Sequence, residues 1–292
     1  MLRKIIDSCT KRSARLRNIQ NLTKLWGLSL RIERREDRSF ARERETLEDL
    51  IKELKIDKGF VVDAAASDGI SQSCTLGLFE DENWSGLAIE MDPVKFYKLA
   101  YLYSTFSNVK LSRNRITPDN IVDLLRSNEI PTDFDVLNLD IDSYDYYVID
   151  SLLRGGFRPK VITMEINEKI PPGIFFTVDF EQDHYWQGDH FYGCSIDAAC
   201  SVVKKFDYVL LKVDYNNAIF VRSDVAAGRY EDQLAEFAHK SGYQNREQRK
   251  EMFPWNADVE HWLDIGSEEA FVEISTHFEK YSGRFTMKIS DI

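Results

Sequence analysis

The stretch VVDAAASDGI, residues 61–70 of a chain of 292, decides the fold. Two β-branched residues run into an acidic residue and then into small residues, a pattern typical of a buried strand that ends in a turn before a helix. Turns of this kind at the carboxyl end of a strand hold nucleotides in many α/β proteins. Most of the glycines that such a turn carries are absent here, and only Gly69 remains. The stretch therefore predicts either a cofactor loop or a purely structural turn.

The segments after this stretch alternate between strand and helix patterns. We expect strands at residues 60–64, 85–90, 109–111, 134–140 and 159–165. We expect helices between them at residues 71–79, 94–103, 120–127 and 146–153, the first opening with a serine cap and the second with Pro93. This alternation predicts an α/β fold with a doubly wound, mostly parallel sheet that is covered by helices on both faces.

The end of the predicted sheet follows a different pattern. Residues 208–213 (YVLLKV) and 218–222 (AIFVR) are apolar strands separated by the turn-forming stretch DYNN. This spacing predicts a β-hairpin in place of a crossover helix. The expected sheet thus has seven strands with an antiparallel last strand, an ending that an ordinary dinucleotide dehydrogenase lacks.

Changes in charge and pattern divide the chain into three parts. Residues 1–56 form a predicted basic helical arm, residues 57–224 the α/β domain, and residues 225–292 a helical extension rich in aromatic residues. The arm is expected to pack on its own domain or on a second subunit, and contact with an anionic membrane surface or an acidic substrate is the alternative. Two helical extensions around one domain favour a homo-oligomer such as a dimer.

Composition restricts the compartment and the partners. A net charge of −11 argues against a nucleic-acid partner, because binding phosphates nonspecifically requires a basic surface. No stretch approaches the ~20 apolar residues of an integral membrane segment. The four cysteines show no metal-ligand spacing and are expected to be reduced thiols. Together these features predict a cytoplasmic protein.

Acidic side chains follow several of the predicted strands, at the sheet edge where doubly wound proteins bind ligands. Glu90 ends the second strand, where a carboxylate can accept both hydroxyls of a cofactor ribose. Asp63 and Asp68 in the first turn would repel a pyrophosphate. A cofactor with a cationic amino group suits them better, and S-adenosylmethionine fits that description.

Oxygen ligands gather after the fourth and fifth strands. Asp140 and Asp142 lie on one side of an extended strand end, and Glu165 and Asn167 repeat the same spacing on the neighbouring strand. These oxygen donors, Asp142, Glu165 and Asn167 above all, would make a site for Mg²⁺ or Ca²⁺. Two alternatives remain open. One of these acids acts directly as a general base, or Asp140 or Asp142 contacts the cofactor while the others cap helices.

The segment 167–193 is expected to be a long irregular loop with a functional role, because its aromatic content argues against disorder. It contains His184 and His190, and a loop histidine can remove a proton at neutral pH. His190 is the stronger candidate, since it directly precedes the stretch that re-enters a helix at Ser195. Both histidines could equally be packing residues.

Five stretches together resemble a known family: VVDAAASDGISQSCTLGLF, WSGLAIEMDP, FDVLNLDIDSYDYYVIDSL, PKVITMEIN and GDHFYGCSI. In this order, over residues 57–223, they resemble the FkbM-related branch of the class I S-adenosylmethionine-dependent methyltransferases, which is linked to O-methylation of sugars, surface glycans and natural products. The resemblance implies a Rossmann-like methyltransferase fold with S-adenosylmethionine as the cofactor.

The resemblance also assigns roles to residues. Asp63, Asp68 and Gly69 match the acidic positions and the last glycine of the family's first cofactor loop, and Glu90 matches its ribose-binding acid. Ala65 and Ser67 stand where the family commonly has glycines, and these residues enter positive φ at a higher cost. The implied cofactor contacts are Asp63, Ala65, Ser67, Asp68, Gly69, Glu90 and Asp140.

These features predict an O-methyltransferase that acts on a hydroxyl of a sugar, a glycan or a small natural product. Asp142 and His190 are the expected catalytic residues, and a divalent metal could assist them. Two rival interpretations are a non-catalytic scaffold with a methyltransferase-like fold and, with less support, a nicotinamide-dependent dehydrogenase, which would lack the GxGxxG motif here.

Overall fold

The computed structural model describes residues 39–290 of the chain. The predicted basic arm lies mostly outside these residues. The short turn Phe40–Arg42 and helix α2 (Glu43–Leu54) are the described part of it. Helix α2 buries Leu47, Leu50 and Ile51 against one face of the sheet.

A seven-stranded sheet forms the centre of the molecule, in the order β3-β2-β1-β4-β5-β8-β7. Its strands are β1 (Gly59–Ala64), β2 (Trp84–Ile89), β3 (Val109–Ser112), β4 (Val136–Leu139), β5 (Val161–Glu165), β7 (Tyr208–Asp214) and β8 (Asn217–Arg222). Strand β1 pairs in parallel with β2 and β4, and β8 is antiparallel to both β5 and β7. This arrangement confirms the predicted fold class, including the hairpin at its end.

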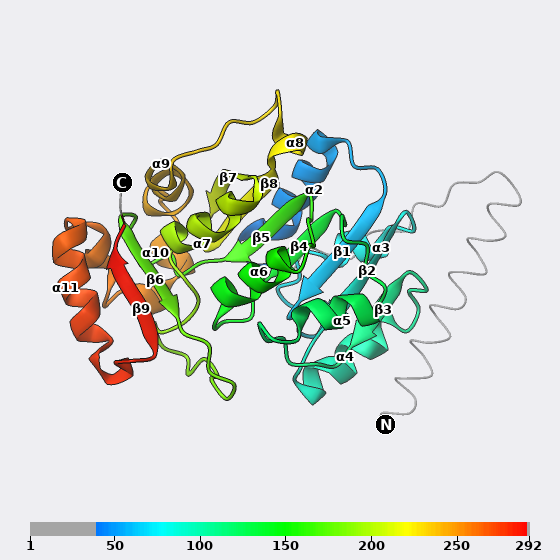
Figure 1. Cartoon of the computed structure of the whole chain (residues 1–292), viewed down its shortest axis with the longest axis horizontal. Coiled ribbons are helices and arrows are strands. Elements are labelled where there is room, and N and C mark those ends of the chain that lie inside the picture. The colour runs from blue at the N-terminus through cyan, green and yellow to red at the C-terminus, as the bar shows by residue number, and fades with distance from the viewer. Residues whose placement is uncertain (1–38, 291–292) are drawn as a thin grey trace, which may run out of the picture.

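Helices cover both faces of the sheet (Figure 1). Successive strand residues point to opposite faces, so Val61 packs with α2, α3 and α4, whereas Val62 packs with α5, α6 and α7. The helices after α2 are α3 (Leu76–Glu80), α4 (Pro93–Tyr103), α5 (Ile121–Ser127), α6 (Asp145–Arg154), α7 (Ile196–Val203), α8 (Ser223–Ala226), α9 (Ala235–His239), α10 (Arg249–Met252) and α11 (Ser267–His277). Short helical turns occupy Lys204–Phe206, Lys240–Gln244, Pro254–Asn256, Glu260–Leu263 and Glu279–Tyr281.

The helix expected at residues 71–79 begins later than predicted, at Leu76. Ser71 does not cap it, because the Ser71 hydroxyl and backbone N–H both donate to the Asp68 carboxylate. The Ser73 hydroxyl instead accepts from the Leu76 N–H, 3.1 Å away. The residues between Ser71 and Leu76 are thereby released from the helix and are free to line a cavity.

A second, two-stranded sheet lies outside the main one. Strand β6 (Ile174–Val178) pairs antiparallel with β9 (Phe285–Ile289). The sequence did not predict either strand: β6 lies in the segment expected to be an irregular loop, and β9 in the extension expected to be helical. Their apolar faces pack with α11 in a separate cluster that contains Phe176, Trp262 and Phe278.

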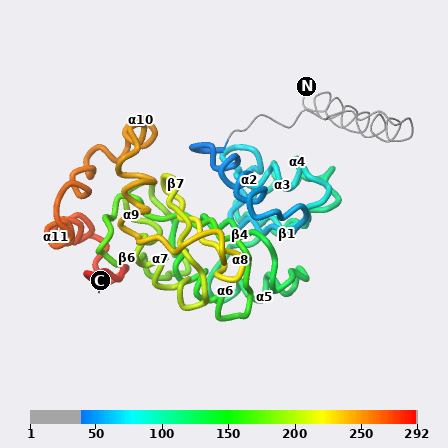
Figure 2. The backbone as a smooth tube through the Cα atoms, turned by 90° about the horizontal axis from the view of Figure 1, so that it is seen from above, coloured from blue at the N-terminus to red at the C-terminus, as the bar shows by residue number. Residues whose placement is uncertain are grey.

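The two-stranded sheet lies at one end of the molecule (Figure 1). In Figures 1 and 2 the segment with β6, β9 and α11 lies at one end, and α3 and α4 lie at the other. Among the described residues, no helix has the length and apolar character needed to cross a membrane. Cys74, Cys194 and Cys200 are buried free thiols.

Candidate functional site

A cavity of about 290 Å³ lies at the carboxyl ends of β1, β2 and β4. Its walls include Asp63, Glu90 and Asp140 together with the turn after β1. Ala65 and Ser67 both line it, as the sequence predicts for cofactor contacts, whereas Asp68 and Gly69 are not among its lining residues.

The turn after β1 adopts the backbone conformation that glycine favours, although it is built from other residues. Ala65 has φ 78° and Ser67 has φ 51°. The N–H groups of Ala65 and Ala66 both donate to the carbonyl oxygen of Ile89, which holds the turn against the end of β2. The turn therefore adopts a conformation that glycine favours without having glycines at these positions, and this adds strain to it.

Strained backbone is concentrated around this cavity. Ten non-glycine residues of the described chain have positive φ, and Ala65, Ser67, Gln72 and Asp142 of these line the first cavity. Such conformations cost of order 1–3 kcal/mol each and cluster at functional sites, where the surrounding structure holds them. Their concentration here favours a ligand site over a merely structural turn.

Glu90 holds the strained turn in place. Its Oε2 accepts from the Ser67 N–H at 2.9 Å, and its Oε1 accepts from the Asp92 N–H at 2.7 Å. A carboxylate has about four lone-pair sites, so each oxygen can still accept one hydroxyl group. Glu90 is 6% exposed and lines the cavity, as a ribose-binding acid would.

Asp63 connects separate chain segments through hydrogen bonds. Its oxygens accept from the Thr75 hydroxyl at 2.5 Å and from the Asn138 side-chain amide at 2.9 Å. Burial raises the pKa of this carboxyl, and the two hydrogen bonds oppose that rise. Asp63 thus joins β1, β4 and the start of α3 while lining the cavity.

Asp68 and Gly69 stabilise the turn on the side that faces away from the cavity. The Asp68 carboxylate accepts from the backbone N–H groups of Ile70 and Ser71. Burial opposes ionisation of Asp68, but these hydrogen bonds outweigh it and lower the pKa of its carboxyl. Gly69 has φ 75°, and a Cβ there would lie 2.7 Å from a methyl carbon of Leu99 in α4. Both residues support the loop without facing the cavity.

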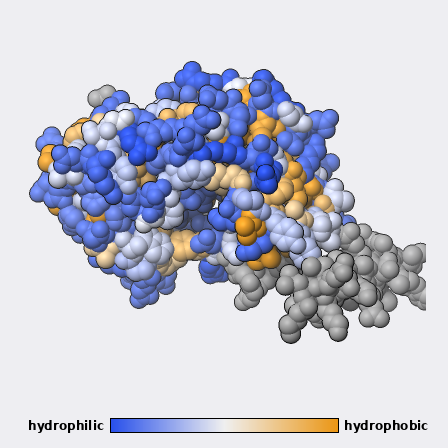
Figure 3. Space-filling model, turned by 90° about the horizontal axis from the view of Figure 1, so that it is seen from below, coloured by the Kyte–Doolittle hydropathy of each residue, from blue (hydrophilic) through white to orange (hydrophobic). Residues whose placement is uncertain are grey.

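A second cavity of about 620 Å³ adjoins the first. Asp140, Asp142, Gln72 and Trp186 line both cavities. The second cavity is also lined by residues from distant parts of the chain: Phe40, Glu43, Glu165, Lys169, Gly188, Asp189, His190, Tyr192, Asn216, Phe253, Trp255, Asp258 and His277. Figure 3 shows a mostly hydrophilic face that is hollowed near its centre, with hydrophobic patches beside the hollow.

Three carboxyl groups meet where the cavities join. One oxygen from each of Asp140, Asp142 and Glu165 lies within 4.8 Å of the others. Burial, together with the charges of Asp142 and Asp145, raises the pKa of Asp140 to about 8. Burial and the neighbouring Asp140 raise the pKa of Glu165 well above its usual value, and burial also raises that of Asp142. Such mutual repulsion favours a bound cation or proton.

Asp145 fixes the orientation of Asp142. Its two oxygens accept from the N–H groups of Ile141 and Ser143, at 2.9 and 3.1 Å, on either side of Asp142. This clamp stabilises the positive φ of 56° at Asp142, a conformation that aspartate tolerates better than most residues. Burial raises the pKa of Asp145 to about 6.

Glu165 and Asn167 present unpaired oxygen atoms. Glu165 Oε1 accepts from the Asn216 side chain at 3.0 Å, whereas its Oε2 has no hydrogen-bond partner among the described residues. The Asn167 amide donates to the carbonyl oxygens of His190 and Tyr192, and its Oδ1 is likewise buried without a partner in this part of the chain. The unpartnered Glu165 Oε2 belongs to the carboxyl cluster and fits the donor set of a divalent cation, whereas Asn167 lines neither cavity.

The two candidate histidines line different cavities. His190 faces the second cavity, and its Nε2 lies 3.1 Å from Asp258 Oδ1. His184 lines the first cavity, and burial together with Arg284 lowers its pKa. The structure brings His190 into the second cavity with the carboxyl cluster but pairs it with Asp258.

The segment that carries these histidines is held from both sides. Arg284 beside β9 donates to Glu181 and contacts His184 Nδ1 at 3.2 Å. On the side of the first cavity, Arg115 donates to the carbonyl oxygen of His184 and lies 4.4 Å from the centre of the Tyr185 ring. This roof loop, residues 181–190, therefore covers both cavities and is anchored by Arg115 and Arg284, which lie far apart in the chain.

Sequence reasoning missed several residues of the site. Asp145 was recognisable only as part of an acidic run, Gln72 was assigned to a helix, and Lys169 lay in an apparent loop. Arg115 follows the third strand in the chain, and its position at a strand end was the one available signal.

No protein-family model and no curated protein matches the chain. Among solved structures, the N-terminal domain of EvdMO1 in the presence of SAH and D-fucose is 11% identical, with a TM-score of 0.40, over 70% of this chain and 95% of that one. The methyltransferase domain of bacterial CtHen1-C is 11% identical with a TM-score of 0.42, over 62% and 97% of the two chains. An S-adenosylmethionine-dependent methyltransferase from Clostridium acetobutylicum is 10% identical with a TM-score of 0.39, over 73% and 99%. These similarities are too low to assign this chain an activity.

Proposed function

We propose that this protein is an S-adenosylmethionine-dependent O-methyltransferase that acts on a hydroxyl of a sugar, a glycan or a small natural product. One observation carries the proposal: a strained cofactor-type cavity and a second cavity meet at Asp140 and Asp142. A group-transfer enzyme needs such a junction, because donor and acceptor must be held in line at a short distance. The antiparallel β8 disfavours a dinucleotide dehydrogenase.

The first cavity has the features needed for the cofactor. Glu90 would accept the ribose hydroxyls, the turn at Ala65–Ser67 would approach the amino-acid portion, and Asp140 would face its positive charge. When bound, S-adenosylmethionine supplies an electrophilic methyl group. The acidic walls at Asp63 and Asp140 suit a cationic ligand, whose charge would favour the ionised form of both carboxyl groups.

The carboxyl cluster would activate the acceptor hydroxyl by promoting the loss of its proton. Asp142 lines both cavities and would remove the proton from the hydroxyl, while Asp145 keeps its orientation. Asp140, Asp142 and Glu165 would hold Mg²⁺, and such a cation lowers the pKa of a bound hydroxyl. His190 is a second candidate for the base, with Asp258 as its partner.

The experiment that tests the proposal is a calorimetric titration with S-adenosylhomocysteine, with and without Mg²⁺, on the wild type and Glu90→Ala. We expect micromolar binding that Glu90→Ala weakens by about tenfold or more, because a buried hydrogen-bonding group is lost and the turn is released. Glu269→Ala, an exposed carboxylate of α11, is the control and should bind as the wild type does. Absence of binding under every condition would instead support a non-catalytic scaffold.

A further inference from the structure

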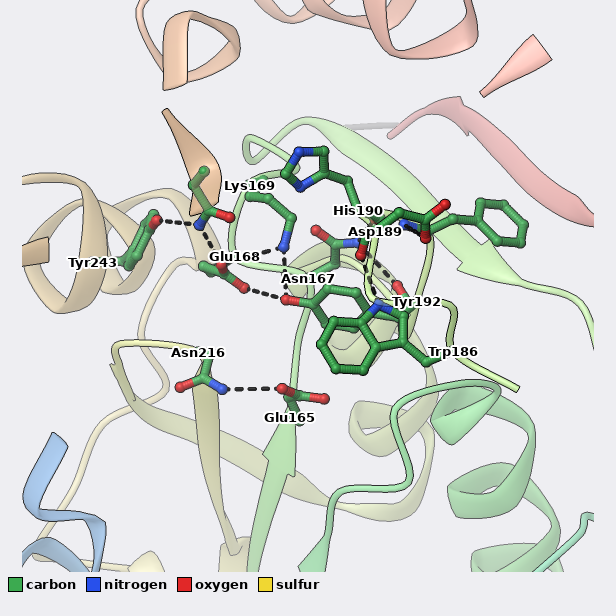
Figure 4. Close-up of polar contacts among 12 residues, drawn as sticks. Glu165, Asn167, Glu168, Lys169, Trp186, Asp189, His190, Tyr192, Asn216 and Tyr243 are labelled. Carbon is green, nitrogen blue, oxygen red and sulfur yellow. Dashed lines mark hydrogen bonds and ion pairs between the residues drawn. The ribbon is translucent and has the colours of Figure 1, made fainter. Parts of the chain in front are cut away.

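The wall of the second cavity contains a buried lysine that the proposed reaction does not use. Lys169 is 2% exposed, yet it lines the cavity. Its Nζ donates to the Tyr192 hydroxyl at 2.7 Å and to Glu168 Oε1 at 3.3 Å. Figure 4 shows the side chains of Lys169 and Glu168 converging on the Tyr192 hydroxyl.

The carboxylate that accompanies Lys169 is fully occupied. Glu168 Oε2 accepts from the Tyr192 hydroxyl at 2.8 Å, and Oε1 accepts from the Asn256 side chain at 2.7 Å. Glu168 is not among the lining residues of the second cavity, so it balances the charge of Lys169 from behind. A buried ion pair is seldom more stabilising than apolar residues of the same volume. Stability alone therefore does not account for this network.

Lys169 retains a donor for a ligand. An ammonium group has three N–H donors, and among the described residues Nζ has two acceptors, Glu168 and Tyr192. On the same wall, Glu165 is 8% exposed and has an unpartnered Oε2. The segment after β5 thus offers the cavity one hydrogen-bond donor, whereas Glu165 at the end of β5 belongs to the carboxyl cluster.

The charge of the cavity restricts what this donor can bind. Lys169 is balanced by Glu168, and three acidic residues outside the carboxyl cluster of Asp140, Asp142 and Glu165 also line the cavity: Glu43, Asp189 and Asp258. A phosphate or carboxylate on the acceptor would meet net negative charge there. The rings of Trp186 and Tyr192, with centres 5.7 Å apart, and that of Trp255 provide apolar surface on the same cavity.

We propose that Lys169 determines acceptor specificity: its Nζ donates to a neutral oxygen of an uncharged, polyhydroxylated acceptor, and the surrounding acids exclude acceptors that carry a phosphate or a carboxylate. This inference rests on the proposed function, because it assigns the second cavity to the acceptor. It goes further by naming the charge of the acceptor and the residue that binds it.

The test measures saturation-transfer NMR signals from small probes on protein saturated with S-adenosylhomocysteine. The neutral probes are methyl glucoside and methyl galactoside, and the anionic probes are glucuronate and glucose phosphate. The variant is the double substitution Lys169→Met with Glu168→Gln, which removes both charges and leaves no buried carboxylate unpaired. The matched control is Lys204→Met with Asp232→Asn, an exposed pair at 2.7 Å outside both cavities.

We expect the neutral probes to bind the wild type and the control equally and to bind the double variant about tenfold more weakly, the effect of losing one charged hydrogen bond. The anionic probes should bind the wild type more weakly than the neutral ones. Equal or tighter binding of the anionic probes, undiminished binding to the double variant, or no binding of any neutral probe to the wild type would overturn the inference.

Calorimetry with S-adenosylhomocysteine separates the two proposals. Failure of the wild type to bind it overturns the proposed function, whereas normal binding with the wrong probe pattern overturns only the role of Lys169. If the double variant does not fold, Lys169→Arg replaces it. This substitution keeps the ion pair but projects a larger group into the cavity, so neutral probes should bind it more weakly, and unchanged binding counts against the inference.

Discussion

The two cavities share a wall but are built in different ways. The first is formed mainly by the turns that follow consecutive strands, such as Ala65 after β1, Glu90 after β2 and Asp140 after β4. The second combines Phe40, Trp255 and His277 with the segment after β5, residues that come from both ends of the described chain. The first cavity therefore follows from local strand and turn patterns, whereas the second depends on long-range packing.

This difference separates two kinds of function. A site made of strand ends in a sheet can stay constant, because each turn is fixed by the strand beside it. A site made of distant loops can change in shape and charge without disturbing the sheet. We expect substitutions in the first cavity to affect cofactor binding and those in the second to affect the acceptor.

The largest effect is expected at the junction. Asp142→Asn should lower turnover by about 100-fold or more, because a general base contributes at least that much, while the affinity for S-adenosylhomocysteine changes little. Asparagine also tolerates the positive φ at this position, so the backbone should persist. Single-turnover formation of S-adenosylhomocysteine measures the effect, with Asp150→Asn on α6, which lines neither cavity, as the control. Unchanged turnover would make His190 the stronger candidate for the base.

The carboxyl cluster should also make stability depend on pH. Asp140 has a usual pKa of 3.8 and a pKa of about 8 in the folded protein, so the folded state holds a proton that the unfolded state releases. The stabilisation from this proton is complete below about pH 4 and is lost as the pH rises toward 8. In EDTA, the Tm of the wild type should therefore fall by several degrees more than the Tm of Asp140→Asn over this pH range.

The same measurement is repeated with a divalent metal ion. Added Mg²⁺ should reduce the fall in Tm, because a bound cation replaces the proton between the carboxylates. If the Tm of the wild type and that of Asp140→Asn depend on pH in the same way, both with and without Mg²⁺, the interpretation of this cluster is wrong.

A smaller effect is expected from the anchor of the roof loop. Arg284→Met removes the contacts with Glu181 and His184, and it should weaken acceptor binding by up to about fivefold, since partly exposed ion pairs contribute up to about 1 kcal/mol. S-adenosylhomocysteine binding should weaken by a similar factor, because His184 lines the first cavity. Arg154→Met, which breaks an exposed pair with Asp150 at 2.7 Å, is the matched control. Unchanged binding of both ligands would show that Arg284 does not hold the loop in place.

The smallest effect concerns the strained turn. Ser67→Gly should raise the free energy of unfolding by up to about 1 kcal/mol, because glycine adopts positive φ without the cost that serine bears. Ala66→Gly, at a neighbouring position without positive φ, should destabilise the protein instead. Urea denaturation of both variants measures the difference. A loss of stability in Ser67→Gly would mean that its side chain stabilises the loop.

The sequence predicted the first region well, because strand ends can be located from hydrophobic runs. Glu90, Asp140 and Glu165 lie at the carboxyl ends of their strands, as expected. The sequence could not show that Ala65 and Ser67 keep positive φ, since this depends on the hydrogen bonds to Ile89 and Glu90.

The second region escaped prediction for a different reason. The short strands β6 and β9 pair with each other across most of the C-terminal half, and neither pattern is strong alone. The position of Lys169 in a buried network depends on Asn256 and Tyr192, which the sequence places far away. Local patterns contain no information about such pairings.

The pairing of β6 with β9 also has a consequence during synthesis. Asp179 and Thr286, which are hydrogen-bonded in the finished protein, are separated by 107 residues. At about 5–20 residues per second, the ribosome needs on the order of 5–20 s to make that stretch. During this time the edge of β6 has no partner strand, and an open edge is a template for aggregation. The nascent chain therefore passes through an interval in which a chaperone would be most useful.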